Sequence, residues 1–300
     1  MTAAAASRVA FASANGMQLC YETFGDPAAP PMVLVMGLAT QMIVWDDEFC
    51  ALLAARGFHV VRFDNRDIGM STKLLQARTP SVAELMFASA TRLRFRVPYV
   101  LRDMAADTVG LLDALGIGAA HVVGASMGGM IAQEMAIAFP SRVRTLTSIM
   151  STTGDPKLPR AKPRALAVLM RRLPRDRDEY VAAFVETWRV LAADHFPFDA
   201  AYWARKGAES YDRGMNPPGA ARQLLAIIAS GNRTKALRHV RAPALVIHGS
   251  DDPLIPVQAG LATAAAIPGA KLMTIDGMGH SFPREVWPRI IDAIAQHAAR

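Results

Sequence analysis

Cysteine is scarce in this sequence, since 300 residues contain only two, Cys20 and Cys50. Neither belongs to a metal-ligand spacing, and two isolated thiols are typical of a protein from a reducing compartment. The sequence also lacks any apolar run near the ~18 residues of a membrane span. Its first residues show no basic start followed by an apolar core, which a secretory leader would have. We therefore expect a cytoplasmic protein without a membrane span or a metal.

Acidic residues are in the minority, because 33 Lys and Arg stand against 26 Asp and Glu and give a net charge of +7. Such a balance raises the question of an anionic partner. The arginine runs are short, however, and acidic residues interleave the second one, which favours solvated faces over a binding surface. No zinc-finger spacing or RNA-binding aromatic pattern accompanies them, so we expect no nucleic acid partner. The runs are Arg92, Arg94 and Arg96, and Arg171, Arg172, Arg175 and Arg177.

Apolar segments rich in β-branched residues recur along the chain and end at turn-forming residues. Because they are apolar almost throughout, they are typical of parallel strands that helices cover on both faces. We expect these strands at residues 32–37, 59–65, 120–126, 143–150, 244–250 and 271–277. Helical patterns, with apolar residues three and four apart, occupy residues 45–57, 100–118, 128–140 and 285–300. The alternation predicts an α/β fold with a mostly parallel central sheet.

Two segments depart from this alternation. Between residues 9 and 24, Asn15-Gly16 separates two alternating runs, which predicts an antiparallel hairpin at one edge of the sheet. Residues 152–240 contain no convincing strand and show helical patterns at residues 164–173, 178–192 and 219–231. We expect a core domain built from residues 1–151 and 241–300. Residues 152–240 then form a helical cap, inserted before the last two strands.

One turn carries the clearest chemical pattern. Gly124-Ala125-Ser126-Met127-Gly128 matches G-x-S-x-G, with an expected strand before the serine and an expected helix after it. A turn this sharp holds the serine in a strained conformation, and glycines at Gly124 and Gly128 give it clearance. The following helix directs its N-terminal N–H groups toward the serine, where an acyl-transfer intermediate develops negative charge. Ser126 is therefore a candidate nucleophile.

A serine needs an imidazole to accept its proton and a carboxylate to orient that imidazole. Asp251 and Asp252 directly follow the expected strand at residues 244–250, and His280 follows the last expected strand. These positions lie beyond the carboxyl ends of strands, where active sites of open α/β sheets collect. The residues alone leave the choice between Asp251 and Asp252 open. A metal site at His248 and these two carboxylates has no supporting ligand spacing.

Together these motifs resemble the α/β-hydrolase fold superfamily, in its capped serine-esterase branch. The resemblance runs from about Met17 to the C-terminus and is weakest through residues 155–215. The segments "VLVMG", "RFDNRDIGMST" and "VIHGSDDPLIP", with the Ser-Met-Gly turn, most resemble the bacterial branch that includes aclacinomycin methylesterase. In the family pattern the acid lies three residues after the glycine of the H-G turn and four before a proline. Gly249 and Pro256 thereby select Asp252 over Asp251.

The resemblance also implies an oxyanion hole. The segment "VLVMGLATQMIVW" resembles the family's oxyanion loop, with Met36 in place of a histidine, and implies the backbone N–H groups of Leu38 and Met127 as the donors. The segment "DNRDIGMS" resembles a family turn in which glycine usually occupies the position of Asp67. That departure concerns a structural turn and leaves the three catalytic candidates unaffected.

These observations predict a cofactor-independent serine carboxylesterase that acts on a small hydrophobic ester, as a monomer or homodimer. Ser126 is the expected nucleophile, His280 the general base and then acid, and Asp252 the group that orients the imidazole. The same triad serves carbon–carbon bond hydrolases and cofactor-free perhydrolases, which stay as alternatives. A non-catalytic binding protein on the same fold is a further alternative. It is disfavoured because all three triad positions are filled.

Overall fold

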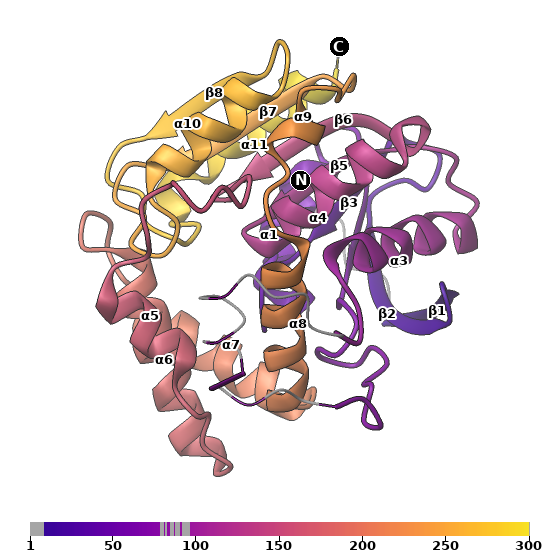
Figure 1. Cartoon of the computed structure of the whole chain (residues 1–300). Helices are drawn as coiled ribbons and strands as arrows, with labels where there is room; N and C mark the ends of the chain where they lie inside the picture. The colour runs from indigo at the N-terminus through magenta and orange to yellow at the C-terminus, as the bar shows by residue number, and fades with distance from the viewer. Residues whose placement is uncertain are drawn as a thin grey trace.

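The computed structural model of the chain describes residues 9–78 and 97–299 and, between them, residues 81, 83, 84, 87 and 91. Its strands form one eight-stranded sheet in the order β1-β2-β4-β3-β5-β6-β7-β8 (Figure 1). The strands are β1 (Ala10–Ala14), β2 (Met17–Phe24), β3 (Pro31–Val35), β4 (His59–Phe63), β5 (Ala120–Ala125), β6 (Val143–Ile149), β7 (Ala244–Gly249) and β8 (Lys271–Ile275).

The first two strands form the expected hairpin. Asn15 and Gly16 both have positive φ angles, of 50° and 76°, as the tight turns that suit twisted hairpins require. β1 pairs antiparallel with β2, β2 pairs antiparallel with β4, and every later pairing in the sheet is parallel. The prediction of a mostly parallel sheet with an antiparallel N-terminal edge is confirmed.

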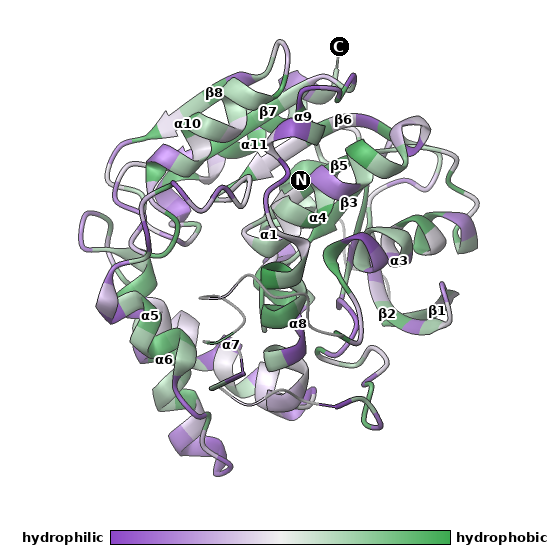
Figure 2. Ribbon diagram, in the orientation of Figure 1, coloured by the Kyte–Doolittle hydropathy of each residue, from purple (hydrophilic) through white to green (hydrophobic). Residues whose placement is uncertain are grey.

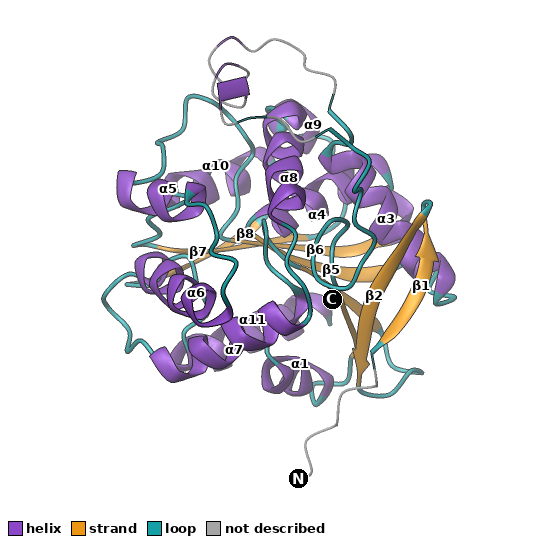
Figure 3. Ribbon diagram, turned by 90° about the horizontal axis from the view of Figure 1, so that it is seen from below, coloured by secondary structure: helices purple, strands orange, loops and turns teal. Residues whose placement is uncertain are grey.

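Helices cover both faces of this sheet (Figure 3). On one face, α3 (Leu101–Ala114), α4 (Met127–Ala138) and α10 (Val257–Ala266) pack against the strands. On the other face lie α1 (Asp47–Ala54) and α11 (Trp287–Ala298). β4, β5 and β7 are buried along their whole length, which agrees with their nearly continuous apolar sequence. Short 3₁₀ turns at Met42–Val44, Pro140–Arg142 and Arg284–Val286 complete this part of the fold.

Further helices separate β6 from β7. They are α5 (Pro163–Met170), α6 (Arg177–Ala192), α7 (Ala200–Asp212), α8 (Pro217–Ser230) and the short α9 (Thr234–Leu237). α5, α6 and α7 gather beside the sheet, and α8 runs from them toward α3 (Figure 1). Hydrophobic residues concentrate on α4 and the central strands, whereas the N-terminal end of α6 is hydrophilic (Figure 2). We call α5–α8 the inserted helices.

The structure corrects several expectations about single elements. Three α-helices of the described residues were not predicted: α7, the short α9 and α10. α10 is composed mostly of alanine and other apolar residues, so it shows no polar face from which a period could be recognised. The predicted strands extend one or two residues too far, since the chain turns at Asp64 and at Ser126 to make other contacts.

Of the two arginine runs, the structure describes only the second. Arg92, Arg94 and Arg96 lie outside the described residues. Arg171, Arg172, Arg175 and Arg177 are exposed, and Arg177 pairs with Asp212, as expected for a solvated surface. Among the helices that the structure describes, none has the length and apolar character needed to cross a bilayer.

Candidate active site

Ser126 occupies the sharp turn between β5 and α4. Its backbone angles are φ 56° and ψ −120°, a conformation that L-residues rarely adopt. The Ser126 N–H donates to the carbonyl of Ile149 on the neighbouring strand at 2.9 Å, and the Ser126 carbonyl accepts the hydroxyl of Ser151 at 2.8 Å. These bonds hold the strained residue from both sides and leave its hydroxyl free to face other groups.

The glycines of the turn allow three backbone segments to approach one another. A Cβ atom on Gly124 would lie 2.1 Å from the carbonyl oxygen of Gly128. A Cβ atom on Gly128 would lie 2.0 Å from the carbonyl oxygen of Val35, at the end of β3. Both neighbours are backbone atoms, which cannot move aside as a flexible side chain would. Glycine at these two positions therefore allows the first turn of α4 to pack directly against the ends of β3 and β5.

The three side chains that the sequence singled out meet at this turn. Ser126 Oγ lies 3.0 Å from His280 Nε2, and His280 Nδ1 lies 2.7 Å from Asp252 Oδ2. Asp252 and His280 are both buried, whereas Ser126 is half-buried. Asp251 is not part of this chain of contacts, because it is exposed and its carboxylate accepts the hydroxyl of Ser250 at 2.9 Å.

Asp252 is held as an ionised carboxylate. Its Oδ1 accepts the backbone N–H groups of Leu254 at 2.9 Å and Ile255 at 2.8 Å, and His248 Nε2 lies 3.5 Å from its Oδ2. Burial by itself raises the pKa of Asp252, but the charge of His280 and the hydrogen bonds from His248 and His280 outweigh it. The pKa is lowered to about 2, so Asp252 carries its negative charge at neutral pH.

The hydrogen-bond pattern fixes the direction in which a proton can move. An ionised carboxylate only accepts, so the His280 proton lies on Nδ1 and points at Asp252. Nε2 then presents its lone pair to the hydroxyl of Ser126. This arrangement can remove the Ser126 proton while a negative charge stabilises the imidazolium that results.

Two backbone N–H groups border the serine. Gly37 lies against it, since a Cβ atom there would be 3.2 Å from Ser126 Cβ. The N–H of the next residue, Leu38, has no acceptor within the part of the chain that the structure describes. Met127 is the first residue of α4, so its N–H has no partner inside the helix. The two positions that the sequence resemblance implied as donors therefore both lie beside Ser126 with N–H groups available to a ligand.

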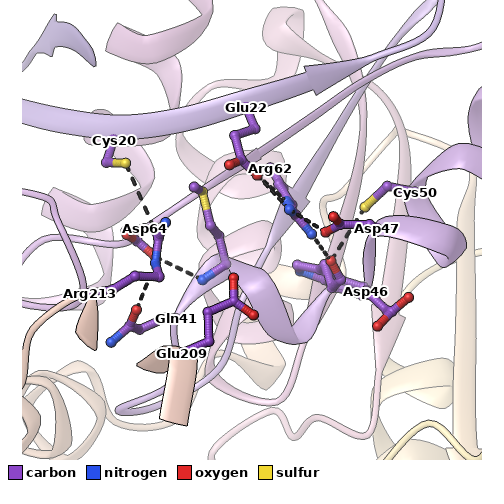
Figure 4. A network of polar contacts seen from close by, with 12 residues as sticks. Cys20, Glu22, Gln41, Asp46, Asp47, Cys50, Arg62, Asp64, Glu209 and Arg213 are labelled. Atoms are coloured by element: carbon purple, nitrogen blue, oxygen red, sulfur yellow. Dashed lines mark hydrogen bonds and ion pairs between the residues drawn. The ribbon is translucent and has the colours of Figure 1, made fainter. Parts of the chain in front are cut away.

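Sequence reasoning missed the side chains that support this region. The loop of residues 37–41, which follows β3 and which we call the oxyanion loop, contacts Gln223 of α8 and Arg213 at the end of α7. Arg213 also pairs with Asp64 at 2.6 Å (Figure 4). These partners lie about half the chain away in the sequence and belong to no motif, so no local pattern indicated them.

Asp67, which replaces the usual glycine of its turn, is part of the same support. It has a φ of 71°, which aspartate tolerates better than most residues. Its buried carboxylate accepts Arg222 of α8 at 2.6 Å and the hydroxyl of Tyr99 at 2.9 Å. The turn thus keeps the backbone conformation that favours glycine and gains an ion pair to an inserted helix.

Comparisons with known proteins agree with this architecture. Residues 30–283 match the family model of the alpha/beta hydrolase fold. The chain is 31% identical to rhodomycin D methylesterase DnrP of Streptomyces peucetius, over 92% of this chain and 93% of that protein. It is 27% identical to a putative carbamate hydrolase, RutD, of Caulobacter sp. strain K31, over 88% of this chain and 89% of that protein.

Solved structures with the same fold include proteins of lower sequence identity. The meta-cleavage product hydrolase CumD of Pseudomonas fluorescens IP01 superposes with a TM-score of 0.76 at 17% identity, over 96% of each chain. The esterase RhEst1 of Rhodococcus sp. ECU1013 superposes with a TM-score of 0.72 at 19% identity, over 98% of this chain and 99% of the other. At these identities the likeness concerns the fold.

Proposed function

The chain belongs to the α/β-hydrolase fold family, and from this premise we propose that it is a serine esterase in which Ser126, His280 and Asp252 cleave carboxylic esters. The observation that carries the proposal is the continuous set of contacts from Ser126 Oγ through His280 to Asp252, at 3.0 Å and 2.7 Å. The relatives named as methylesterases support an ester as the substrate.

The reaction proceeds through an acyl-enzyme. Ser126 Oγ attacks the ester carbonyl carbon as its proton passes to His280 Nε2, and the carbonyl oxygen becomes an oxyanion. Collapse of this intermediate breaks the ester bond, and His280 returns the proton to the departing alcohol. Water then attacks the acyl-enzyme with His280 again as base, and the acid leaves. Throughout, Asp252 remains ionised and holds the imidazole in place.

The oxyanion is bound by the N–H groups of Leu38 and Met127. Support comes from the contact of Gly37 with Ser126 and from the position of Met127 at the first turn of α4. The positive end of the helix dipole adds to the hydrogen bond from Met127. Each such donor is typically worth about 10²–10³-fold in turnover.

Residues 152–240 act as a cap that shapes the substrate site. The end of α6 contacts the loop that carries His280, because the His280 N–H donates to the carbonyl of Leu191 at 2.7 Å. Trp188 of α6 stacks on Trp203 of α7, with ring centroids 4.1 Å apart. Trp188 lies three residues before Leu191 on α6, and aromatic side chains on this helix favour an ester with a hydrophobic acyl or alcohol portion.

We place the enzyme in the cytoplasm, where it acts on a small hydrophobic ester as a monomer or homodimer. Support for a reducing compartment comes from Cys20 and Cys50, which are both buried free thiols. Burial raises the pKa of Cys20 to about 11 and that of Cys50 to about 12, so neither is a reactive thiolate at neutral pH. Light scattering of the purified protein measures the oligomeric state, and a mass above that of a dimer would contradict this assignment.

A labelling experiment and an ester assay test the function together. We expect a serine-directed fluorophosphonate to label the wild-type protein at Ser126, and the protein to hydrolyse p-nitrophenyl acetate and methyl esters of apolar acids. Ser126→Ala should lose the label and at least about 10⁴-fold in kcat/KM. A folded wild-type protein that neither reacts with the probe nor hydrolyses any ester would overturn the proposal. Turnover of dienone acids alone would assign carbon–carbon bond hydrolysis instead.

A further inference from the structure

Gln223 of α8 connects the oxyanion loop, which lies against Ser126, to the turn that contains Arg66 and Asp67. Its side chain is fully buried. Gln223 Oε1 accepts the backbone N–H of Ala39 at 2.9 Å, and Gln223 Nε2 donates to the backbone carbonyl of Arg66 at 2.9 Å. Both ends of a buried amide are thus used, and both partners are backbone groups. The side chain fixes where the oxyanion loop lies relative to the turn that contains Asp67.

The peptide between Leu38 and Ala39 is held at both of its polar groups. Gln223 takes its N–H, and the hydroxyl of Thr40 donates to the Leu38 carbonyl at 2.9 Å. Ala39 has a φ of 56°, a left-handed conformation that costs an alanine about 1–2 kcal/mol. A residue that is unfavourable in isolation needs contacts that maintain it, and the bond from Gln223 is attached at this residue.

The rest of the oxyanion loop is fastened in a similar way (Figure 4). Gln41 Nε2 donates to the carbonyl of Ser210 at 2.7 Å, and Gln41 Oε1 accepts Arg213 Nε at 2.9 Å. Asp64 accepts the N–H of Met42 at 2.8 Å and the Arg213 guanidinium at 2.6 Å. The inserted helices therefore contact the loop on the far side of Ala39 as well. Of these hydrogen bonds from the inserted helices, the one from Gln223 reaches Ala39, the residue directly after Leu38.

We propose that Gln223 is a positioning residue for the oxyanion hole, through which α8 sets the orientation of the Leu38 N–H. The inference rests on the proposed function, since it assigns a support to a group that acts only in ester cleavage. The peptide that Gln223 holds directly follows the one that carries the Leu38 N–H. Loss of the Gln223 acceptor lets the Leu38–Ala39 peptide rotate toward a relaxed φ and moves Leu38 away from the oxyanion.

The test compares an ester with its thiono analogue, in which sulfur replaces the carbonyl oxygen. Sulfur accepts hydrogen bonds more weakly, so a defect in the oxyanion hole reduces hydrolysis of the ester more than that of the thionoester. A general loss of folded protein reduces both rates equally. The ratio of the two kcat/KM values, with p-nitrophenyl acetate and its thiono analogue, therefore reports on the oxyanion hole alone.

Gln223→Met keeps the volume of the side chain and removes both hydrogen bonds. We expect its ester-to-thionoester ratio to fall on the order of 10-fold, mainly through kcat of the ester, with KM little changed. Gln223→Glu keeps an acceptor for Ala39 and should preserve most of the ratio. Gln223→Ser is too short to reach Ala39 and replaces Gln223→Met if that variant does not fold.

Ser230→Ala is the matched control. Ser230 lies on the same helix, seven residues after Gln223, accepts the N–H of Leu101 at 2.9 Å and donates to the carbonyl of Ala226 at 2.7 Å, so its hydrogen bonds go to residues outside the oxyanion loop. We expect this variant to lose some stability and to keep the wild-type ratio. An active wild-type enzyme whose ratio is unchanged by Gln223→Met would overturn the inference. A wild-type protein that hydrolyses neither ester would instead contradict the proposed function.

Discussion

The two halves of this active site are fastened by different kinds of contact. Ser126, Asp252 and His280 follow strands of the core sheet, and backbone groups hold them: Ile149 for the serine, Leu254 and Ile255 for the aspartate, Leu191 for the histidine. The oxyanion loop depends on side chains of the inserted helices, above all Gln223 and Arg213. The triad residues therefore depend on backbone contacts at the ends of strands and, at His280, on one backbone contact from α6, whereas the oxyanion loop depends on side chains from the insertion.

The largest effect should come from the triad carboxylate. Asp252→Asn keeps the shape of the side chain but removes the charge and allows the wrong imidazole tautomer, so we expect kcat/KM to fall on the order of 10⁴-fold. Asp251→Asn alters an exposed residue outside the contacts to His280 and should change kcat/KM little. Assays with p-nitrophenyl acetate measure both. A larger loss from Asp251→Asn than from Asp252→Asn would assign the carboxylate that orients His280 to Asp251 instead.

The next largest effect concerns the ion pair that joins the Asp67 turn to α8. Asp67→Gly removes the strain of a positive φ but also removes the carboxylate that pairs with the buried Arg222. Breaking a buried pair in this way costs about 3–5 kcal/mol of folding free energy. The double variant Asp67→Gly with Arg222→Met should recover much of that loss. Urea unfolding gives both values. A single variant as stable as the wild type would show that the turn does not need the inserted helix.

A smaller effect should appear in acid. The folded-state pKa of Asp252 is about 2, below the value of about 3.9 in an unfolded chain. Its contribution is therefore complete above about pH 4 and is lost as the pH falls through 2, and it amounts to about 2 kcal/mol. Unfolding of the wild type and of Asp252→Asn is compared between pH 2 and 5. The wild type should lose more stability on acidification, and parallel curves would contradict the assignment of an ionised, paired carboxylate.

The smallest effect should come from a single bond in the triad half. Ser151→Ala removes the hydroxyl that donates to the Ser126 carbonyl, which we expect to cost about 1 kcal/mol of stability. The activity should stay within about threefold of the wild type, because the Ser126 N–H remains bonded to Ile149. Thermal unfolding and the ester assay check both values. An activity loss as large as that of Gln223→Met would contradict the claim that the triad depends less on single side-chain contacts than the oxyanion loop does.

The sequence was sufficient to predict the parallel sheet, the hairpin at Asn15-Gly16 and the residues that meet at the turn after β5. These features depend on local chemistry, such as the apolar strands and the glycines beside Ser126, and local chemistry is visible in a short window of sequence. Gln223 and Arg213 were not predicted, because they act through contacts formed only when α7 and α8 fold back on the core. Arg222, the partner of Asp67, was not predicted for the same reason. The sequence showed only that an aspartate stands where the family turn usually has glycine.

The buried pair of Asp67 and Arg222 limits which inserted helices this core can accept. A chimera could replace residues 152–240 with the corresponding region of a related hydrolase. The buried carboxylate of Asp67 would then lose its ion pair unless the new segment also supplied an arginine at the position of Arg222. The inserted helices are therefore not energetically independent of the core. We expect an exchange of the insertion to keep its stability only when the Asp67 turn is exchanged together with it.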